Sequence, residues 1–263
     1  MPAPLYAGID VGASATKVAL IDGSGALAGF GIVPSGVDFA VAGDAALAAA
    51  LAAAGSAARD VAAAVSTGYG RKNVRTAGSA KTEIACHARG AHSSFPEAIT
   101  VIDIGGQDNK IIKLDAAGNR LDFKMNRKCA AGTGAFLDEI ARRLGVGVEE
   151  MEGLARHSTQ DVEIGSFCTV FSATEILGLV RRGVAVADIA KGAFRSVVKR
   201  VTEMDQLSGA IVATGGVIAH NPTIVALLGE ALGTEVRVPP HPQLAGAFGA
   251  ALFARDEAIA GAA

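Results

Sequence analysis

The chain has 263 residues, of which 50% are hydrophobic and only 5% aromatic, and it contains no tryptophan. This length accommodates one or two domains with substantial cores, and the Ala- and Gly-rich composition favours closely packed α/β layers. A formal net charge of −2 argues against nucleic-acid or anionic-membrane partners, and no apolar run approaches the roughly 18 residues needed to span a bilayer.

The first part of the chain predicts a β-meander, followed by helices and one more strand. The three strands of the meander are expected at Leu5–Val11, Thr16–Asp22 and Ala26–Val33. The Ala-rich stretch Ala45–Ala64 predicts a long helix that Gly55 interrupts. A strand at Ala62–Ser66 and a helix at Glu83–Ala91 complete this part.

The same pattern then starts again, which predicts a duplicated α/β domain. Its strands are expected at Ala98–Ile104, Lys110–Leu114 and Leu121–Asn126, and four helices at Thr133–Leu144, Val148–Ala155, Ser172–Arg182 and Val186–Asp205. The last elements are strands at Gly209–Thr214 and Glu235–Val238 and a closing helix at Ala245–Ala260. From the repeat we expect one domain at residues 1–95 with the C-terminal helix 245–263, and a second at residues 96–244.

Both halves place an acid at a strand end before a turn of small residues. Asp10-Val11-Gly12 opens the first turn and Asp103-Ile104-Gly105-Gly106 the second. Small residues let backbone N–H groups approach phosphate oxygens, and an aspartate can hold hydrated Mg²⁺. Either turn alone is an ordinary hairpin, but two facing hairpins can clamp the phosphates of a nucleotide. The expected phosphate contacts are Gly12, Ala13, Ser14, Ala15, Thr16, Lys17, Gly105, Gly106 and Gln107.

Three further segments suit a nucleotide and also have simpler interpretations. Gly215, Gly216 and Val217 follow a strand and could lie against adenosine, or form a tight strand-to-helix turn. Gly132, Thr133 and Gly134 open a helix whose N–H groups could face a phosphate, and Thr133 could equally be its N-cap. Glu175 could bind ribose, or complete a capping box with Ser172.

Two of the three cysteines lie in motifs that lead into predicted helices. Cys129 precedes Gly132-Thr133-Gly134, and Cys168 lies in Ser166-Phe167-Cys168-Thr169-Val170-Phe171. Two cysteines fill half of the Cys₄ set of a [4Fe–4S] cluster, and a two-fold dimer would fill it. Cys86 lacks further ligands at a suitable spacing, so we expect it to be structural. An odd cysteine count and an N-terminus without a signal sequence predict a cytoplasmic protein with thiol or metal chemistry rather than disulfides.

The order of these motifs resembles the acetate kinase/sugar kinase/Hsp70/actin superfamily, with its actin-like ATPase fold and ribonuclease H-like domains. More narrowly, the chain resembles the ATP-dependent activators of 2-hydroxyacyl-CoA dehydratases and the related ATP-binding subunits of benzoyl-CoA reductases. The matching motifs are Ser66–Arg71, Val101–Asp108, Met125–Gly134 and Cys168–Phe171, and together the resemblance covers essentially the whole chain.

This resemblance implies a homodimer that binds ATP or ADP with Mg²⁺ and carries one [4Fe–4S] cluster, held by both copies of Cys129 and Cys168. It implies ATPase activity coupled to electron transfer, from ferredoxin or flavodoxin to a dehydratase, in an anaerobic setting. We assign Asp10, Asp103 and Gln107 to hydrolysis, with both acids holding Mg²⁺ through water. Two alternatives remain at this point: a subunit of an aryl-CoA reductase, and a sugar or N-acetylhexosamine kinase without a cluster.

Overall fold

The computed structural model describes residues 3–126, 128–165 and 168–261, which form two compact units. Within these residues, the first unit combines the chain up to Glu97 with Leu114–Arg120 and the chain from Leu244 onward. The second unit holds Ala98–Lys113 and Leu121–Gln243. No helix in the described part of the chain is both long and apolar enough to cross a membrane.

The strands of the described residues form two five-stranded sheets with the same order of strands. The first sheet has the order β3-β2-β1-β4-β5 and the second β8-β7-β6-β9-β10. The predicted duplication is therefore confirmed, because three consecutive strands and two later ones occupy corresponding places in each sheet. The strands are β1 (Leu5–Val11), β2 (Ala15–Ile21), β3 (Leu27–Pro34), β4 (Val61–Thr67), β5 (Ser79–Ala80), β6 (Ile99–Ile104), β7 (Asn109–Leu114), β8 (Arg120–Asn126), β9 (Ala210–Thr214) and β10 (Val236–Arg237).

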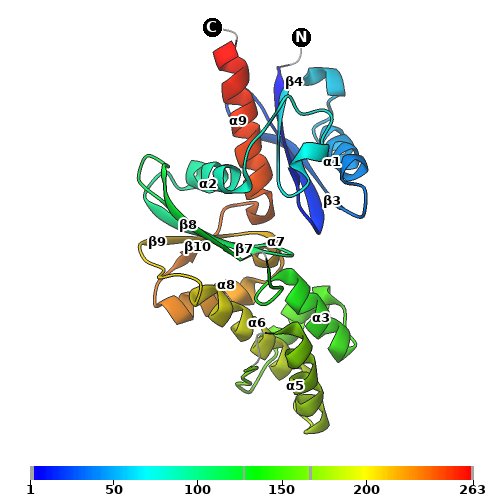
Figure 1. Cartoon of the computed structure of the whole chain (residues 1–263), viewed down its shortest axis with the longest axis vertical. Coiled ribbons are helices and arrows are strands. Elements are labelled where there is room, and N and C mark those ends of the chain that lie inside the picture. The colour runs from blue at the N-terminus through cyan, green and yellow to red at the C-terminus, as the bar shows by residue number, and fades with distance from the viewer. Residues whose placement is uncertain (1–2, 127, 166–167, 262–263) are drawn as a thin grey trace. The chain divides into compact units, whose positions relative to one another are not determined.

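The helices pack around these sheets, and most are close to their predicted positions (Figure 1). They are α1 (Phe39–Ala53), α2 (Glu83–Ser94), α3 (Gly134–Leu144), α4 (Met151–Arg156), α5 (Thr169–Arg181), α6 (Val186–Thr202), α7 (Gly216–His220), α8 (Pro222–Leu232) and α9 (Ala245–Gly261).

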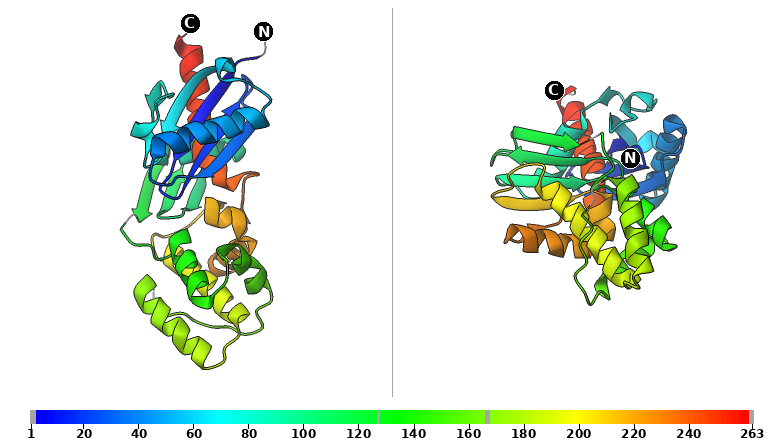
Figure 2. Two further views of the ribbon diagram at one scale, coloured as in Figure 1. Left: turned by 90° about the vertical axis from the view of Figure 1, so that its right-hand side faces the viewer. Right: turned by 60° about the horizontal axis from the view of Figure 1, so that its bottom comes forward.

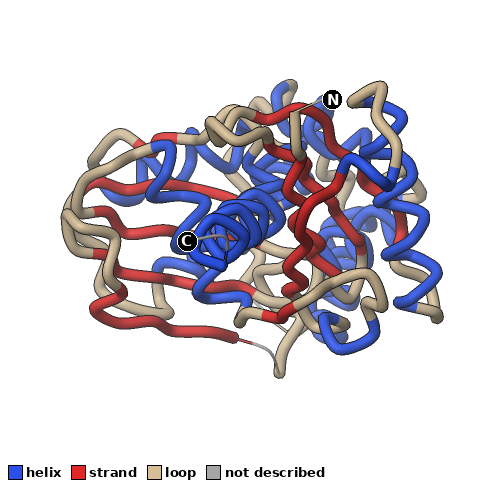
Figure 3. The backbone as a smooth tube through the Cα atoms, turned by 90° about the horizontal axis from the view of Figure 1, so that it is seen from above, coloured by secondary structure: helices blue, strands red, loops and turns tan. Residues whose placement is uncertain are grey.

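In the first unit, helices α1 and α9 cover opposite faces of the sheet (Figures 2 and 3). Glycines make the close approach possible. A Cβ on Gly31 would lie 2.3 Å from the Ala46 carbonyl oxygen of α1, and one on Gly8 would lie 1.9 Å from the Ala247 carbonyl oxygen of α9. Both distances are shorter than a side chain tolerates, so the helix backbones rest directly on the strands. This packing fixes the end of β1 within the unit.

The core of the second unit lies between its sheet and helices α3, α6 and α8. Phe136 of α3 and Phe194 of α6 are fully buried there, together with Ile102 of β6 and Leu228 of α8. Burial of large apolar side chains stabilises a fold by about 1.5–3 kcal/mol each. The core therefore anchors β6, whose carboxyl end carries Asp103.

For the Ala-rich stretch Ala45–Ala64, the expected start of the helix was wrong and the expected interruption at Gly55 is confirmed. Helix α1 begins at Phe39, because the Asp38 side chain caps it by accepting from the Ala40 and Val41 amides at 3.0 and 3.1 Å. It ends at Ala53, and Gly55 follows with a φ of +62° that other residues rarely adopt. The residues after the turn enter strand β4.

The region between Cys168 and the C-terminus also differs from the expectation in places. Helix α5 begins at Thr169 with Cys168 as N-cap, so Ser172 and Glu175 lie inside the helix and form no capping box. Helix α6 ends at Thr202, before the predicted Asp205. Helices α7 and α8 after Gly215 had no counterpart in the prediction.

Candidate nucleotide and cysteine sites

Asp10 is the second-last residue of β1 and is buried, with 3% of its surface exposed. Its Oδ2 atom lies 2.9 Å from the Lys17 Nζ of the neighbouring strand β2. The turn between the two strands closes through a 3.2 Å hydrogen bond from the Gly12 amide to the Ala15 carbonyl. The first predicted hairpin is therefore a tight turn with an acid and a lysine at its base.

The tip of this turn is held by the end of β3. The Ser35 hydroxyl donates to the Gly12 carbonyl at 2.6 Å, and the Ser35 amide donates to the Ser14 carbonyl at 3.0 Å. Thr16 is fully buried and its hydroxyl is 2.9 Å from that of Ser35. Ala13 and Ser14 are exposed, so the turn presents its tip while Thr16 serves the inside of the hairpin.

Asp103 occupies the corresponding place at the end of β6, with 2% of its surface exposed. Its Oδ2 atom lies 3.1 Å from Lys110 Nζ, and its Oδ1 atom accepts a 2.9 Å hydrogen bond from the Thr214 hydroxyl of β9. Lys110 also pairs with Asp108 at 2.6 Å. The Gly105 amide donates to the Asp108 carbonyl at 2.9 Å, which closes a turn of the same spacing as the first.

Gln107 and the two glycines of the second turn differ in exposure. Gln107 is exposed at the tip, and Gly105 and Gly106 are half-buried. The carbonyl groups of the two glycines accept from the Gly134 and Ala135 amides of α3 at 2.9 and 2.8 Å. The second hairpin is therefore bonded directly to the start of this helix.

This arrangement changes the interpretation of the Gly132-Thr133-Gly134 turn. Thr133 stands at the N-cap position of α3, but its hydroxyl donates backwards to the Ala130 carbonyl at 2.6 Å and makes no cap bond with the helix. The Thr133 amide also donates to Ala130, at 3.1 Å. Two of the three amides assigned to phosphate thus donate within the chain, and a phosphate contact at this turn stays a prediction.

Gly215 forms a tight strand-to-helix turn between β9 and α7. It has a φ of +102°, and a Cβ there would lie 2.3 Å from the Ile104 carbonyl oxygen of β6. Gly216 is half-buried at the start of α7, and Val217 belongs to the core of the second unit. Gly215 is thus required for packing against β6 whether or not adenosine lies beside it.

The three cysteines fall into two environments. Cys129 and Cys168 are free and exposed, whereas Cys86 is free and fully buried in α2. Burial raises the pKa of the Cys86 thiol to about 12, so it stays protonated. This environment is typical of the structural role expected for Cys86.

Only one of the two exposed cysteines lies at a helix start. Cys168 is the N-cap of α5, but Cys129 precedes the N-cap of α3 by four residues. Both cysteines lie in motifs expected to lead into helices, but a helix dipole acts within the first turn, so it can favour a thiolate at Cys168 and not at Cys129. The Cys129 sulfur instead accepts from the Ala131 amide at 3.4 Å. Among the described residues, no group of three or more His, Cys, Asp or Glu could hold a metal ion.

Glu175 of α5 is directed at the segment that precedes Cys168. Its Oε1 atom accepts from the Gly165 amide at 2.9 Å. The beginning of the same segment is held by Asp188 of α6, which accepts from Ser158 and from the Thr159 and Gln160 amides. The two backbone bonds lower the pKa of Asp188 most. A ribose contact of Glu175 stays a prediction; its visible contact is with the chain itself.

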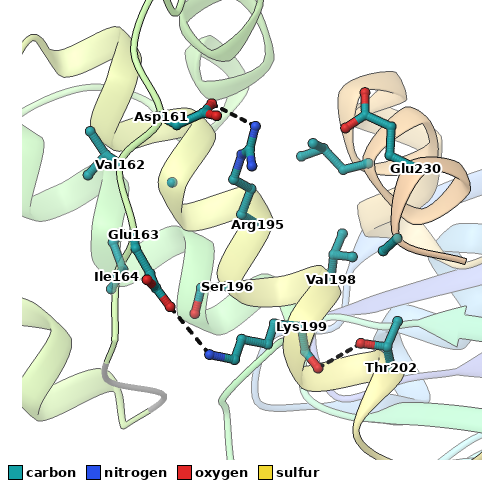
Figure 4. A pocket seen from close by; sticks show the side chains of 13 residues that line it. Asp161, Val162, Glu163, Ile164, Arg195, Ser196, Val198, Lys199, Thr202 and Glu230 are labelled. Carbon is teal, nitrogen blue, oxygen red and sulfur yellow. Dashed lines mark hydrogen bonds and ion pairs between the residues drawn. The ribbon is translucent and has the colours of Figure 1, made fainter.

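The middle of this segment lines a pocket of about 650 Å³ against α6 and α8 (Figure 4). Arg195 and Lys199 of α6 pair there with Asp161 and Glu163 at 2.7 and 3.4 Å. None of the residues assigned to nucleotide or cluster from the sequence lines this pocket. These two ion pairs fasten the segment to α6.

Four residues around the two acids were missed by the sequence reasoning. Lys110 lies seven residues after Asp103, as Lys17 does after Asp10, so the repeat itself could have identified it. Thr214 was noted only as part of a Gly-Gly motif. Gly68 was noted only as part of the Ser66–Arg71 motif. The proximity of Gly68 and His87 to Asp10 could not be predicted, because it depends on the packing of α2 and of the loop after β4.

Three comparisons with known proteins agree on the whole length of the chain. The model of the BadF/BadG/BcrA/BcrD ATPase family matches residues 7–254. The chain is 40% identical to the 2-hydroxyisocaproyl-CoA dehydratase activator of Clostridioides difficile, over 95% of each chain. It is 39% identical to the (R)-2-hydroxyglutaryl-CoA dehydratase activating ATPase of Acidaminococcus fermentans, over 95% of this chain and 97% of that one.

Solved structures show the same likeness and also its limits. The Clostridium difficile activator with bound ADPNP superposes with a TM-score of 0.92 at 38% identity, covering 98% of this chain and 97% of that one. A ROK family glucokinase from Streptomyces griseus superposes with a TM-score of 0.58 at 15% identity, covering 96% of this chain and 99% of that one, which shows a shared fold alone. The duplicated α/β architecture is thus the actin-like ATPase fold, as predicted. A benzoyl-CoA reductase subunit of Thauera aromatica is 34% identical over 64% of this chain and 62% of its own.

Proposed function

Since the chain belongs to the BadF/BadG/BcrA/BcrD ATPase family, we propose that it is an ATP-dependent activator of a 2-hydroxyacyl-CoA dehydratase. In this proposal, ATP hydrolysis drives a single electron to the dehydratase at low potential. The observation that carries the proposal is the pair of exposed, free cysteines in the second unit, Cys129 and Cys168. An ATPase with this fold needs no exposed thiol to bind or hydrolyse its nucleotide.

The nucleotide part of the proposal rests on the two acid hairpins. Asp10 and Asp103 would hold Mg²⁺ through water, and exposed backbone near Ala13, Ser14 and Gln107 would contact phosphate. Each acid lies beside a lysine, Lys17 or Lys110, that can neutralise phosphate charge. The two hairpins thus offer carboxylates for Mg²⁺ and lysines for the phosphates of ATP.

The cysteines fit a shared iron–sulfur cluster. Thiolates are the usual ligands of such clusters, and both thiols are accessible from outside the chain. The Ala131 amide already donates to the Cys129 sulfur. When bound, a [4Fe–4S] cluster supplies one-electron transfer at low potential. Cys129 and Cys168 of two copies would provide its four ligands.

Helix α5 supports pairing of two copies beside these cysteines. It carries four exposed apolar side chains: Val170 and Phe171 in the first turn after Cys168, and Leu177 and Val180 toward the end of the helix. Exposed apolar clusters of this kind mark interaction surfaces. A second copy that shares the cluster would cover this face, and the proposed assembly is a homodimer.

The remaining partners follow from the same proposal. The electron donor would be a ferredoxin or flavodoxin, and the acceptor a dehydratase in the cytoplasm. Arg181 and Arg182 at the end of α5 are exposed cations that suit an acidic donor. An aryl-CoA reductase subunit remains the alternative, and it would pair with a different chain rather than with itself.

Iron analysis of anaerobically prepared protein tests the proposal. We expect a brown dimer with about two irons per chain, because one cluster would serve two chains. Cys129→Ser and Cys168→Ser should each abolish the iron, since each removes two of four ligands. The matched control is Cys86→Ser, which should keep it.

Three outcomes would contradict the proposal: four irons per chain, loss of iron in the Cys86 variant, or a colourless dimer. A monomer that acquires iron only with a second, different chain would favour the reductase alternative. ATP-dependent activation of a dehydratase component, measured as dehydration of a 2-hydroxyacyl-CoA, then separates an activator from an ATPase without this coupling.

A further inference from the structure

Glycines surround the Asp10 carboxylate on both sides. A Cβ on Gly68 would lie 2.5 Å from Asp10 Oδ1. A Cβ on Gly246, in the first turn of α9, would lie 3.1 Å from Asp10 Oδ2 and 2.9 Å from His87 Nε2. Asp10 and His87 therefore face the same small space in front of Gly246, which a side chain at this position would fill.

His87 is a buried titratable residue to which nothing above assigns a role. It lies on α2 with 7% of its surface exposed, and a buried imidazole needs polar partners. The close packing of α2 on α9 sets its depth. A Cβ on Gly90 would lie 2.0 Å from the Ala245 carbonyl oxygen, and one on Gly249 would lie 1.9 Å from that of Cys86.

The second unit shows what the corresponding aspartate receives from its own sheet. Asp103 and Thr214 are register partners on β6 and β9, and the Thr214 hydroxyl donates to Asp103. Asp10 and Thr67 are register partners on β1 and β4 in the same way. The Thr67 hydroxyl lies beside the Cys86 thiol instead.

We propose that His87 replaces this threonine and holds Asp10 through a hydrogen bond from Nε2 to Oδ2, beside Lys17. His87 is then a positioning residue for ATP hydrolysis. It fixes the rotation of the carboxylate, so that Oδ1 keeps one direction on the side of Gly68. The charged partner of Asp10 from the sheet is Lys17 of β2, at 2.9 Å from Oδ2.

The inference rests on the ATPase activity of the proposed function and predicts a particular kinetic result. Binding of nucleotide depends mainly on the hairpin backbones, whereas orientation of Asp10 affects the hydrolytic step. Loss of His87 should therefore lower kcat and leave the KM for Mg-ATP nearly unchanged. Loss of a residue that orients such a group costs about 10–100-fold.

Three variants test it, with steady-state ATPase rates and thermal unfolding measured on each. His87→Leu should lose about 10–100-fold in kcat, with KM within about twofold. His87→Gln keeps an N–H donor and should recover much of this loss. His92→Leu is the matched control on the same helix; His92 contacts the Ala116 carbonyl and should leave kcat unchanged.

A parent kcat in His87→Leu would overturn the inference. So would equal losses in the Leu and Gln variants that follow a common fall in thermal stability, because that result indicates packing alone. A parent protein without ATPase activity would contradict the proposed function itself, which the iron analysis tests separately.

Discussion

Both units carry one buried aspartate at the end of a central strand, and they hold it by different means. In the second unit the sheet itself provides the partners, because Lys110 and Thr214 come from strands on either side of β6. In the first unit Lys17 is the corresponding lysine, and the remaining surroundings come from Gly68 and from helices α2 and α9. Both copies of the sheet have thus kept the acid and the lysine, whereas the remaining contacts of the acid differ between the two units.

The difference indicates which constraints belong to the repeat and which to each unit alone. An acid and a lysine seven residues later recur in both units, together with the tight turn between them. The threonine contact occurs in one unit only, so it serves positioning rather than ligand charge.

Replacing the two acids should have the largest effect. Asp10→Asn and Asp103→Asn should each reduce ATP hydrolysis by about 100-fold or more, because a preorganised charge is lost. The structure adds a cost to stability that the sequence did not suggest, since Asp103 neutralises the buried Lys110 and Asp10 the half-buried Lys17. Breaking a buried pair costs up to about 3–5 kcal/mol.

The stability cost should differ between the units. Lys110 keeps Asp108 at 2.6 Å when Asp103 is changed, whereas Lys17 loses the carboxylate at 2.9 Å. Asp10→Asn should therefore lower the free energy of unfolding more than Asp103→Asn, as measured by urea titration. Asp44→Asn on the exposed side of α1 is the control. Parent ATPase rates in both variants would refute the role given to the acids.

The two register-equivalent threonines offer a sharper test. Thr214→Val removes a hydroxyl that donates to buried Asp103, and should lower kcat about tenfold and stability by about 1–3 kcal/mol. Thr67→Val removes a hydroxyl that lies beside Cys86, and should change kcat by less than about twofold. ATPase rates and urea unfolding of the two variants show whether only Thr214 holds an acid. Equal losses of activity would mean that the two acids are held alike.

Local patterns in the sequence predicted the duplication, the acid turns and all the described strands except β5. Alternation of apolar residues and small-residue turns are short-range signals, and strands such as Leu5–Val11 were located correctly. The start of α1 failed because an Ala-rich run carries no boundary, and the capping side chain of Asp38 lies well before the predicted first turn at Ala45.

The surroundings of Asp10 could not be predicted because they depend on contacts distant in sequence. Gly246 lies more than 200 residues after Asp10, and its meaning appears only when α9 is placed against β1. The Gly134 amide was assigned to phosphate for a similar reason, since nothing local shows that the Gly105 carbonyl would reach it.

The smallest expected effect concerns Cys86 of the first unit. It lies beside Thr67, whose equivalent in the second unit, Thr214, donates to Asp103. Its pKa is raised from 9.0 to about 12, mainly by burial, so the folded protein keeps its proton where the unfolded chain loses it. The stability from this protonated thiol is fully present below pH 9 and is lost as the pH rises toward 12, by about 1.4 kcal/mol per pH unit. Cys86→Ala should therefore lose less stability than the parent between about pH 8.5 and 10.5, where the loss from the thiol begins. Parallel pH profiles of the two proteins in urea unfolding would show that the thiol ionises equally in both states, and hence that its burial by Thr67 and α2 is looser than the structure indicates.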